Sequence, residues 1–170
     1  YRPGEARGFC ARARRRLPDV ELLPTSSLRA CVEEADIIVT ITTSRRPLVM
    51  RHWIQPGTHI NAMGADAPGK QELDPRILRE ATVIVDDRTQ AIHGGELNVP
   101  IAKGQITPRV IHATLGEVLV GRASGRRSRH AITVFDSTGI AVHDVALGSQ
   151  LIRLARRAGR GRSIRFFHWS

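Results

Sequence analysis

Short apolar runs rich in β-branched residues alternate with helical stretches along this chain, and that alternation most constrains its fold. The clearest runs lie at residues 36–42, 58–63, 82–86 and 132–136. Stretches with the composition or periodicity of helices separate them, and such alternation is typical of parallel sheets covered by helices. The sequence therefore predicts an α/β fold with a Rossmann-like, doubly wound, mostly parallel sheet.

The individual strands differ in how clearly the sequence marks them. Residues 36–42 are almost all β-branched or apolar, which predicts a central strand buried on both faces. Shorter strands are expected at residues 20–23 and 164–167, whereas the polar segment 43–47 is expected to be a loop.

Helices are predicted where capping residues precede helical composition. Ser26 or Ser27 is a candidate cap for a helix that reaches Glu34, and Asp74 followed by Pro75 is a typical helix start. A long amphipathic helix is expected to end before Gly159. The predicted helices span residues 5–16, 27–34, 74–80, 107–121 and 141–158, with shorter helical pieces between 90 and 103.

Composition excludes several classes of protein. The 170 residues are 41% hydrophobic and 25% charged, which is typical of one globular domain. Since no run of about 18 apolar residues occurs, no membrane span is predicted. The first residues lack the apolar core of a signal peptide, so we expect a cytoplasmic protein. Because Tyr1 stands first in place of Met, we expect the chain to begin inside a longer protein.

The formal charge of +10 raises nucleic acid as a partner. However, only Lys70 and Lys103 among the 26 basic residues are lysines, aromatic residues make up 4%, and no basic stripe carries interleaved aromatics. Solvated arginines on helix faces and loops therefore explain the charge better than a nucleic-acid site does. Cys10, Cys31 and the seven histidines match no metal-ligand spacing, so no metal site is predicted.

Three loops follow predicted strands and carry small, polar or charged residues, at positions 42–46, 63–70 and 136–140. Ligands of open α/β sheets gather beyond the carboxyl ends of the strands. In the second loop, small residues permit close approach of a cofactor, Asp66 offers a carboxylate, and Lys70 offers a cation. The pattern fits equally an ordinary strand-to-helix loop with Asp66 as a cap and Lys70 in solvent.

The third loop presents the adjacent hydroxyls of Ser137 and Thr138, which suit hydrogen bonding to a carboxamide or a carboxylate. Capping of the following helix is the alternative, and no G-x-S-x-G motif marks Ser137 as a nucleophile. No G-x-G-x-x-G motif occurs anywhere, although a dinucleotide needs such a loop for its pyrophosphate. The residues thus indicate an incomplete nucleotide-type domain without its first βα unit.

Several of these segments resemble one known family. The chain is similar to the ornithine cyclodeaminase and mu-crystallin family in the stretches ADIIVT (35–40), GTHINAMGAD (57–66) and FDSTGIA (135–141). Within the family it looks most like the archaeal-type alanine dehydrogenases. That closer likeness rests on residues 67–74, 93–99, 112–118 and 164–167.

The resemblance implies a homodimeric enzyme with a Rossmann domain for NAD or NADP and a separate N-terminal domain for substrate binding and dimerisation. Residues 1–145 would form part of the Rossmann domain. Residues 146–170 would form a C-terminal helix and tail that packs toward the N-terminal domain. The glycine-rich loop and further substrate residues would lie upstream of Tyr1.

The resemblance also implies roles for individual residues. Asp66 matches the acid–base aspartate beside the substrate amine, and Thr138 matches a second substrate contact. Arg2 stands where the family often has an acidic residue for the adenosine ribose, and this replacement suggests tolerance of NADP. The residues that match cofactor contacts, besides Arg2, are Thr42, Met63, Gly64, Ala65, Lys70 and Ser137.

The activity that the resemblance implies is NAD(P)-dependent oxidative deamination of a small L-amino acid, with L-alanine giving pyruvate and ammonia. Ornithine cyclodeaminase, which converts L-ornithine to L-proline and ammonia, is the alternative enzyme. A non-catalytic binder of the mu-crystallin type is a third interpretation, and the presence of Asp66 argues against it.

Overall fold

The computed structural model describes residues 4–164 of the chain. The chain divides into two compact units, a sheet unit (Tyr1–Thr138) and a helical unit (Gly139–Ser170). The described part of the helical unit contains one helix, α7 (Ala141–Arg157), none of whose residues is buried within the chain. No described helix has the length and apolar character needed to cross a membrane.

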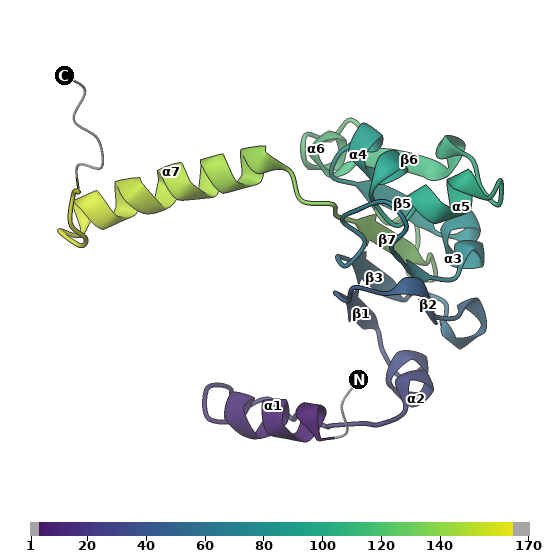
Figure 1. Ribbon diagram of the computed structural model, residues 1–170, viewed down its shortest axis with the longest axis horizontal. Helices are drawn as coiled ribbons and strands as arrows, with labels where there is room; N and C mark the ends of the chain where they lie inside the picture. The colour runs from purple at the N-terminus through teal and green to yellow at the C-terminus, as the bar shows by residue number, and fades with distance from the viewer. Residues whose placement is uncertain (1–3, 165–170) are drawn as a thin grey trace. The chain divides into compact units, whose positions relative to one another are not determined.

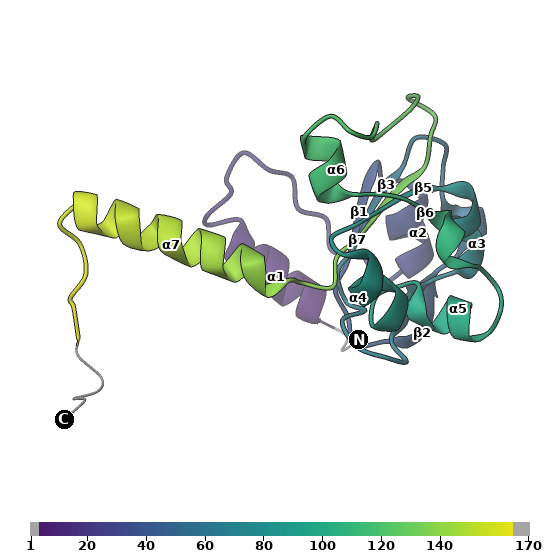
Figure 2. The same cartoon turned by 90° about the horizontal axis from the view of Figure 1, so that it is seen from above.

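The sheet unit is built on five strands that lie side by side (Figures 1 and 2). Every pairing between these strands is parallel, so the predicted α/β class with a parallel sheet is confirmed. In spatial order the strands are β1 (Ile37–Thr40), β3 (His59–Ala62), β7 (Thr133–Asp136), β5 (Thr82–Val85) and β6 (Ile111–Thr114). The register pairs Thr40 with Ala62 and pairs Asp136 with both Ala62 and Val85. Four strands therefore end level with one another.

A second, two-stranded parallel sheet joins β2 (Arg45–Val49) to β4 (Gln71–Leu73). The prediction of a loop at residues 43–47 was therefore wrong from Arg45 onward. The segment begins with polar residues but forms a strand, and the last residue of that strand, Val49, is 1% exposed. Its partner lies more than twenty residues later, so no local pattern announces the pairing.

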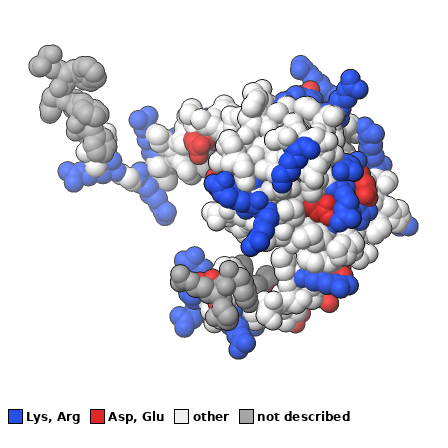
Figure 3. All heavy atoms as spheres, turned by 45° about the vertical axis from the view of Figure 1, so that its right-hand side comes forward, with Lys and Arg blue, Asp and Glu red and all other residues white. Residues whose placement is uncertain are grey.

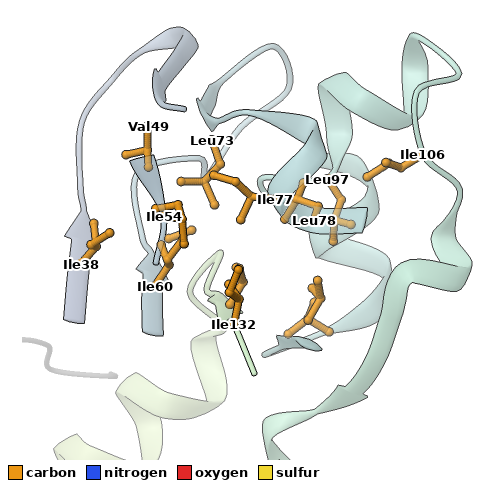
Figure 4. Packing of buried hydrophobic residues seen from close by; sticks show 14 of the residues in the cluster. Ile38, Val49, Ile54, Ile60, Leu73, Ile77, Leu78, Leu97, Ile106 and Ile132 are labelled. Atoms are coloured by element: carbon orange, nitrogen blue, oxygen red, sulfur yellow. The ribbon is translucent and has the colours of Figure 1, made fainter. Parts of the chain in front are cut away.

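The core of the sheet unit lies on one face of the five-stranded sheet. Ile60, Ala62, Val83 and Val85 alternate along their strands and are fully buried, as strand geometry requires of residues that share a face. They pack against helix and loop residues that include Ile77, Leu78 and Leu97 (Figure 4).

Capping residues start several of the helices as predicted. The Ser27 hydroxyl accepts a hydrogen bond from the Ala30 amide at the start of α2 (Leu28–Glu33). The Asp74 carboxylate does the same for Arg76 at the start of α3 (Pro75–Glu80). The remaining helical segments are α1 (Glu5–Ala13), η1 (Arg51–Trp53), α4 (Arg88–His93), α5 (Asn98–Ala102), η2 (Pro108–Val110) and α6 (Leu115–Leu119).

Strand β1 departs from the predicted burial on both faces. Ile38 and Thr40 are buried, but Ile37 and Val39 are 65% and 60% exposed. Within the described residues β1 pairs only with β3, so it forms an edge of the sheet. The exposure of Ile37 and Val39 shows, separately, that one face of β1 has no covering layer among those residues.

Two further element predictions were wrong. Residues 20–23 form no strand, because no described strand lies beside them to pair with their backbone, and Leu23 is 76% exposed. The predicted helix at 107–121 contains η2, β6 and α6 instead, since residues 111–114 pair with β5. Of the predicted strand 164–167, only Ile164 lies within the described residues, and it is not in a strand.

Candidate functional site

The ends of three neighbouring strands bring the predicted loops together. The Met63 amide donates to the Thr40 carbonyl at 2.8 Å, which joins the end of β3 to the end of β1. The Ser137 amide donates to the Ala62 carbonyl at 3.0 Å, which joins β7 to β3. The loops that contain Thr42, Gly64 and Ser137 therefore leave the same edge of the sheet, as the sequence predicted.

Glu72 on β4 ties two of these loops to each other. Its two carboxylate oxygens accept hydrogen bonds from the amides of Thr42 (2.6 Å) and Gly64 (3.0 Å). The backbones are so close that a Cβ atom at Gly64 would lie 2.4 Å from the Thr42 carbonyl oxygen and 2.5 Å from a Glu72 oxygen. The position therefore requires glycine.

Two more buried acidic side chains, Glu96 and Asp136, extend the hydrogen bonding from the backbone of Glu72. Glu96 accepts hydrogen bonds from the amides of Glu72 (2.9 and 3.1 Å) and Leu73 (2.6 Å). Asp136, at the end of β7, accepts the Glu96 amide with both oxygens at 3.0 Å. All three acidic side chains belong to residues that are 0% exposed.

Burial dominates the protonation of the two inner carboxyls. It raises the pKa of Glu96 well above its ordinary value, while the amides of Leu73 and Glu72 oppose the shift and the charges of Asp136 and Glu72 add to it. Burial raises the pKa of Asp136 to about 7, with the Glu96 amide opposing and the charge of Asp86 adding. Loss of water disfavours the charged form of both groups, so each keeps its proton to a higher pH than a free carboxyl group does.

The loop after β3 continues as a turn whose backbone is held by two hydrogen bonds with the side chain of Asn98. The Gly69 amide donates to the Asn98 side-chain oxygen at 2.8 Å, and the Asn98 amide group donates to the Lys70 carbonyl at 3.0 Å. Ala65 in this loop is fully buried. No helix follows Asp66 directly, so the alternative of Asp66 as a helix cap is wrong.

Asp66 projects from this clamped loop with 55% of its side chain exposed. The Lys70 ammonium donates a hydrogen bond to it, and this bond lowers the pKa of the Asp66 carboxyl below its ordinary value. Asp66 is therefore a carboxylate that can accept a proton. Lys70 forms an ion pair here and is not a lone cation in solvent.

The hydroxyls after β7 converge on a carboxylate that the sequence analysis missed. Ser137 and Thr138 donate to separate oxygens of Asp86, at 3.2 and 3.0 Å, and Thr138 also lies 3.2 Å from the Gln90 side-chain oxygen. Neither hydroxyl caps α7, whose N-cap residue is Ile140 and has no side-chain cap. Asp86 thus orients both hydroxyls at the end of β5.

A groove of about 690 Å³ lies next to the loop after β1. Its walls include Thr42, Thr43 and Ser44 together with Leu28 at the start of α2 and Thr25 just before that helix. Pockets of this size and mixed character commonly hold small molecules.

Charged side chains do not form a continuous basic surface on the face of the sheet unit that Figure 3 displays, where Lys and Arg lie in separate groups divided by uncharged surface. Among the described residues, no group of three or more His, Cys, Asp or Glu side chains is arranged to hold a metal ion.

Comparison with known proteins identifies the relatives of the chain. Residues 2–156 match the ornithine cyclodeaminase/mu-crystallin family. The chain belongs to this family. The alanine dehydrogenase of Archaeoglobus fulgidus is 44% identical over 170 residues, which cover 96% of this chain and 53% of that protein. The iminosuccinate reductase of Paracoccus denitrificans is 40% identical over 74% of this chain and 39% of its own length.

Solved structures of family members agree with this relationship. An archaeal alanine dehydrogenase dimer with bound NAD superposes with a TM-score of 0.82 at 44% identity, covering 92% of this chain and 49% of that one. The Δ1-pyrroline-2-carboxylate reductase of Thermococcus litoralis, solved with NADH and L-proline, gives 0.89 at 30% identity and covers 96% and 50%. The chain spans about half the length of the curated relatives it matches.

The structure brings together most of the predicted site residues of this family member, namely Thr42, Met63, Gly64, Ala65, Ser137 and Thr138, with Asp66 and Lys70 on the loop beyond Ala65. Arg2 lies outside the described residues. The sequence analysis missed Glu72, Glu96 and Asp86. Their sequence neighbours include polar and charged residues, such as Gln71 and Asp87, so no local pattern marks them, and nothing in their spacing links them.

Proposed function

We propose that this chain is the cofactor-binding half of an NAD(P)-dependent amino-acid dehydrogenase that converts L-alanine to pyruvate and ammonia. One observation carries the proposal. A loop of small residues, Gly64 and Ala65, is held beside Thr42 at the carboxyl edge of a parallel sheet and presents the exposed carboxylate of Asp66. The 44% identity to the Archaeoglobus alanine dehydrogenase supports the choice of substrate.

The residues at this edge fit a dinucleotide. The loop of Met63, Gly64 and Ala65 has little side-chain bulk, and the adjoining groove beside Thr42 has hydroxyls and room for an adenosine. We assign cofactor contacts to these residues and to Lys70 and Ser137. The bound nicotinamide would supply the hydride acceptor for the reaction.

Asp66 is the proposed acid–base residue. Its carboxylate, kept deprotonated by Lys70, accepts a proton from the substrate ammonium group, so that the nitrogen lone pair becomes available for formation of the imine. Asp66 then releases this proton to solvent, and the regenerated carboxylate orients the water that attacks the imine carbon. Thr138, whose hydroxyl donates to Asp86, is the proposed second substrate contact, because its oxygen can still accept a hydrogen bond from the substrate ammonium group.

The proposal also includes the oligomeric state and the cofactor choice of the full-length enzyme. We propose a homodimer, as in the archaeal alanine dehydrogenase structure. We also propose that Arg2 permits the use of NADP, because a guanidinium group suits a ribose 2′-phosphate. Rates measured with NAD and with NADP test this point, and a strong preference for NAD would remove it.

Two related activities are the second candidates, since each also passes through an imine beside a carboxylate. Ornithine cyclodeamination is supported by the likeness to a lysine cyclodeaminase, with a TM-score of 0.82 at 27% identity. Reduction of a cyclic imine is supported by the TM-score of 0.89 to the pyrroline-carboxylate reductase.

The deciding experiment supplies the full-length protein carrying this chain with L-alanine, L-ornithine or Δ1-pyrroline-2-carboxylate, and records nicotinamide absorbance and proline together. Alanine-dependent formation of NADH supports the proposal, whereas proline from ornithine without net NADH supports the cyclodeaminase. Asp66→Asn should lower turnover by about 10²-fold or more. Asp19→Asn is the matched control, because Asp19 is an exposed carboxylate in the segment between α1 and α2, outside the site. Near-normal turnover in Asp66→Asn would contradict the assigned role.

A further inference from the structure

We propose that Glu72 is a positioning residue for the dinucleotide, and that it sets the separation of the Thr42 and Gly64 loops with Glu96 and Asp136 behind it. The inference rests on the proposed function, since it concerns the same cofactor site. Glu72 acts through the backbone of the two loops and is assigned no contact with cofactor or substrate.

The first argument is that the Glu72 carboxylate takes the place of the next backbone hydrogen bond between β1 and β3, beyond the ends of both strands. Amides of β3 donate to carbonyls of β1 at regular steps, from His59 to Asp36 and finally from Met63 to Thr40. A parallel ladder continued by one step would use the Thr42 amide between the strands. That amide instead donates to Glu72 at 2.6 Å, and the Gly64 amide donates to the other oxygen of the same carboxylate.

The second argument is that this bridge lies where the cofactor loops diverge. The register that pairs Thr40 with Ala62 places Thr42 opposite Gly64. Without the ladder, the carboxylate of Glu72 is what fixes the distance between the two backbones. A carboxylate accepts two backbone amides with strong, charge-assisted hydrogen bonds, whereas a side-chain amide has one acceptor oxygen.

The third argument is that the backbone of Glu72 is itself fixed by a hydrogen bond to a second buried acidic side chain. Its own amide and that of Leu73 donate to Glu96, and the Glu96 amide donates to Asp136. Asp136 directly precedes Ser137, a proposed cofactor contact. The three buried acidic side chains therefore link the loops after β1, β3 and β7 through one buried path.

The test combines two measurements on Glu72→Gln. In the full-length protein, amide hydrogen exchange followed by mass spectrometry should show the segments around Thr42 and Gly64 protected in the wild type and exposed in the variant, while β5 keeps its protection. In the full-length protein, the Kd for NAD should rise by about 10- to 100-fold, the loss expected for a hydrogen bond to a charged group. Turnover at saturating NAD should change much less, because Glu72 touches no reacting atom.

The control is Glu33→Gln, a half-buried glutamate on α2 whose carboxylate pairs with Arg29 on the same helix. If Glu72→Gln does not fold, Glu72→Asp keeps the charge but is one methylene too short to reach both amides. It should also raise the Kd.

Three results would overturn the proposal. The first is rapid exchange of the Thr42 and Gly64 amides in the wild type, a measurement that needs no variant. The second is an unchanged Kd in a folded Glu72 variant whose amides have opened. The third is a fall in turnover at saturating NAD with no change in Kd. If the wild-type protein binds no NAD, the proposed function fails and the positioning role fails with it, while wild-type exchange still reports whether the bridge exists.

Discussion

Replacing Asp136 with Asn should change how the stability of the chain depends on pH. Burial raises the pKa of Asp136 from 3.8 to about 7, so the folded chain holds this proton more tightly than the unfolded chain does. Stability from this group is therefore greatest near pH 4 and falls as the pH rises to about 7. A difference of about 3 pKa units corresponds to roughly 4 kcal/mol at 1.36 kcal/mol per unit.

That magnitude is a large part of the 5–15 kcal/mol that stabilises an ordinary domain. The asparagine side chain has no proton to lose, so Asp136→Asn should gain up to about 4 kcal/mol relative to the wild type between pH 4 and pH 8. Glu96 titrates in both proteins, and because the charge of Asp136 raises the pKa of Glu96, the substitution lowers that pKa and shifts the stability difference in the same direction.

Urea unfolding of the 170-residue chain, followed by circular dichroism at pH 4.5, 5.5, 6.5 and 7.5, measures the difference directly. Asp19→Asn, which removes an exposed carboxylate, is the matched control and should show a difference nearly independent of pH. A pH-independent difference for Asp136→Asn, or one that favours the wild type as the pH rises, would refute the reasoning.

Two further substitutions probe the loop after β3. Gly64→Ala should destabilise the fold by about 1–3 kcal/mol in urea unfolding, because its Cβ would lie 2.4 Å from the Thr42 carbonyl oxygen. The control is Gly148→Ala on α7, where the Cβ meets open space. Equal stability of the two variants would contradict the packing argument. Lys70→Met removes the hydrogen bond that lowers the pKa of Asp66. Activity that requires the Asp66 carboxylate should then be lost at a higher pH on the acidic side of the pH–rate profile, and an unmoved acidic limb would show that Lys70 does not set it.

The sequence predicted those elements whose signal is local. The β-branched runs at 82–86 and 132–136 became β5 and β7, and Ser27 and Asp74 cap helices as their positions indicated. Pairings between distant segments were missed. Residues 45–49 form a strand because they pair with residues 71–73, which lie far along the chain. Residues 111–114 have the composition of a helix, but their pairing with β5 makes them a strand.

The same division applies to the site. A topological rule, that ligands gather at the carboxyl ends of parallel strands, was enough to select the loops of Thr42, Gly64 and Ser137. The carboxylates that hold those loops were not predictable, because Glu72 and Glu96 act on backbone amides up to 30 residues away. Such hydrogen bonds leave no periodic trace in a sequence.

The open side of β1 has a practical consequence for work with the isolated chain. Unpaired backbone groups along an exposed, apolar strand form a template on which another extended segment can add. Ile37 and Val39 supply such a strand. Preparations of the 170 residues alone should consequently be handled dilute, with light scattering as the first check, before any binding result is attributed to the folded monomer.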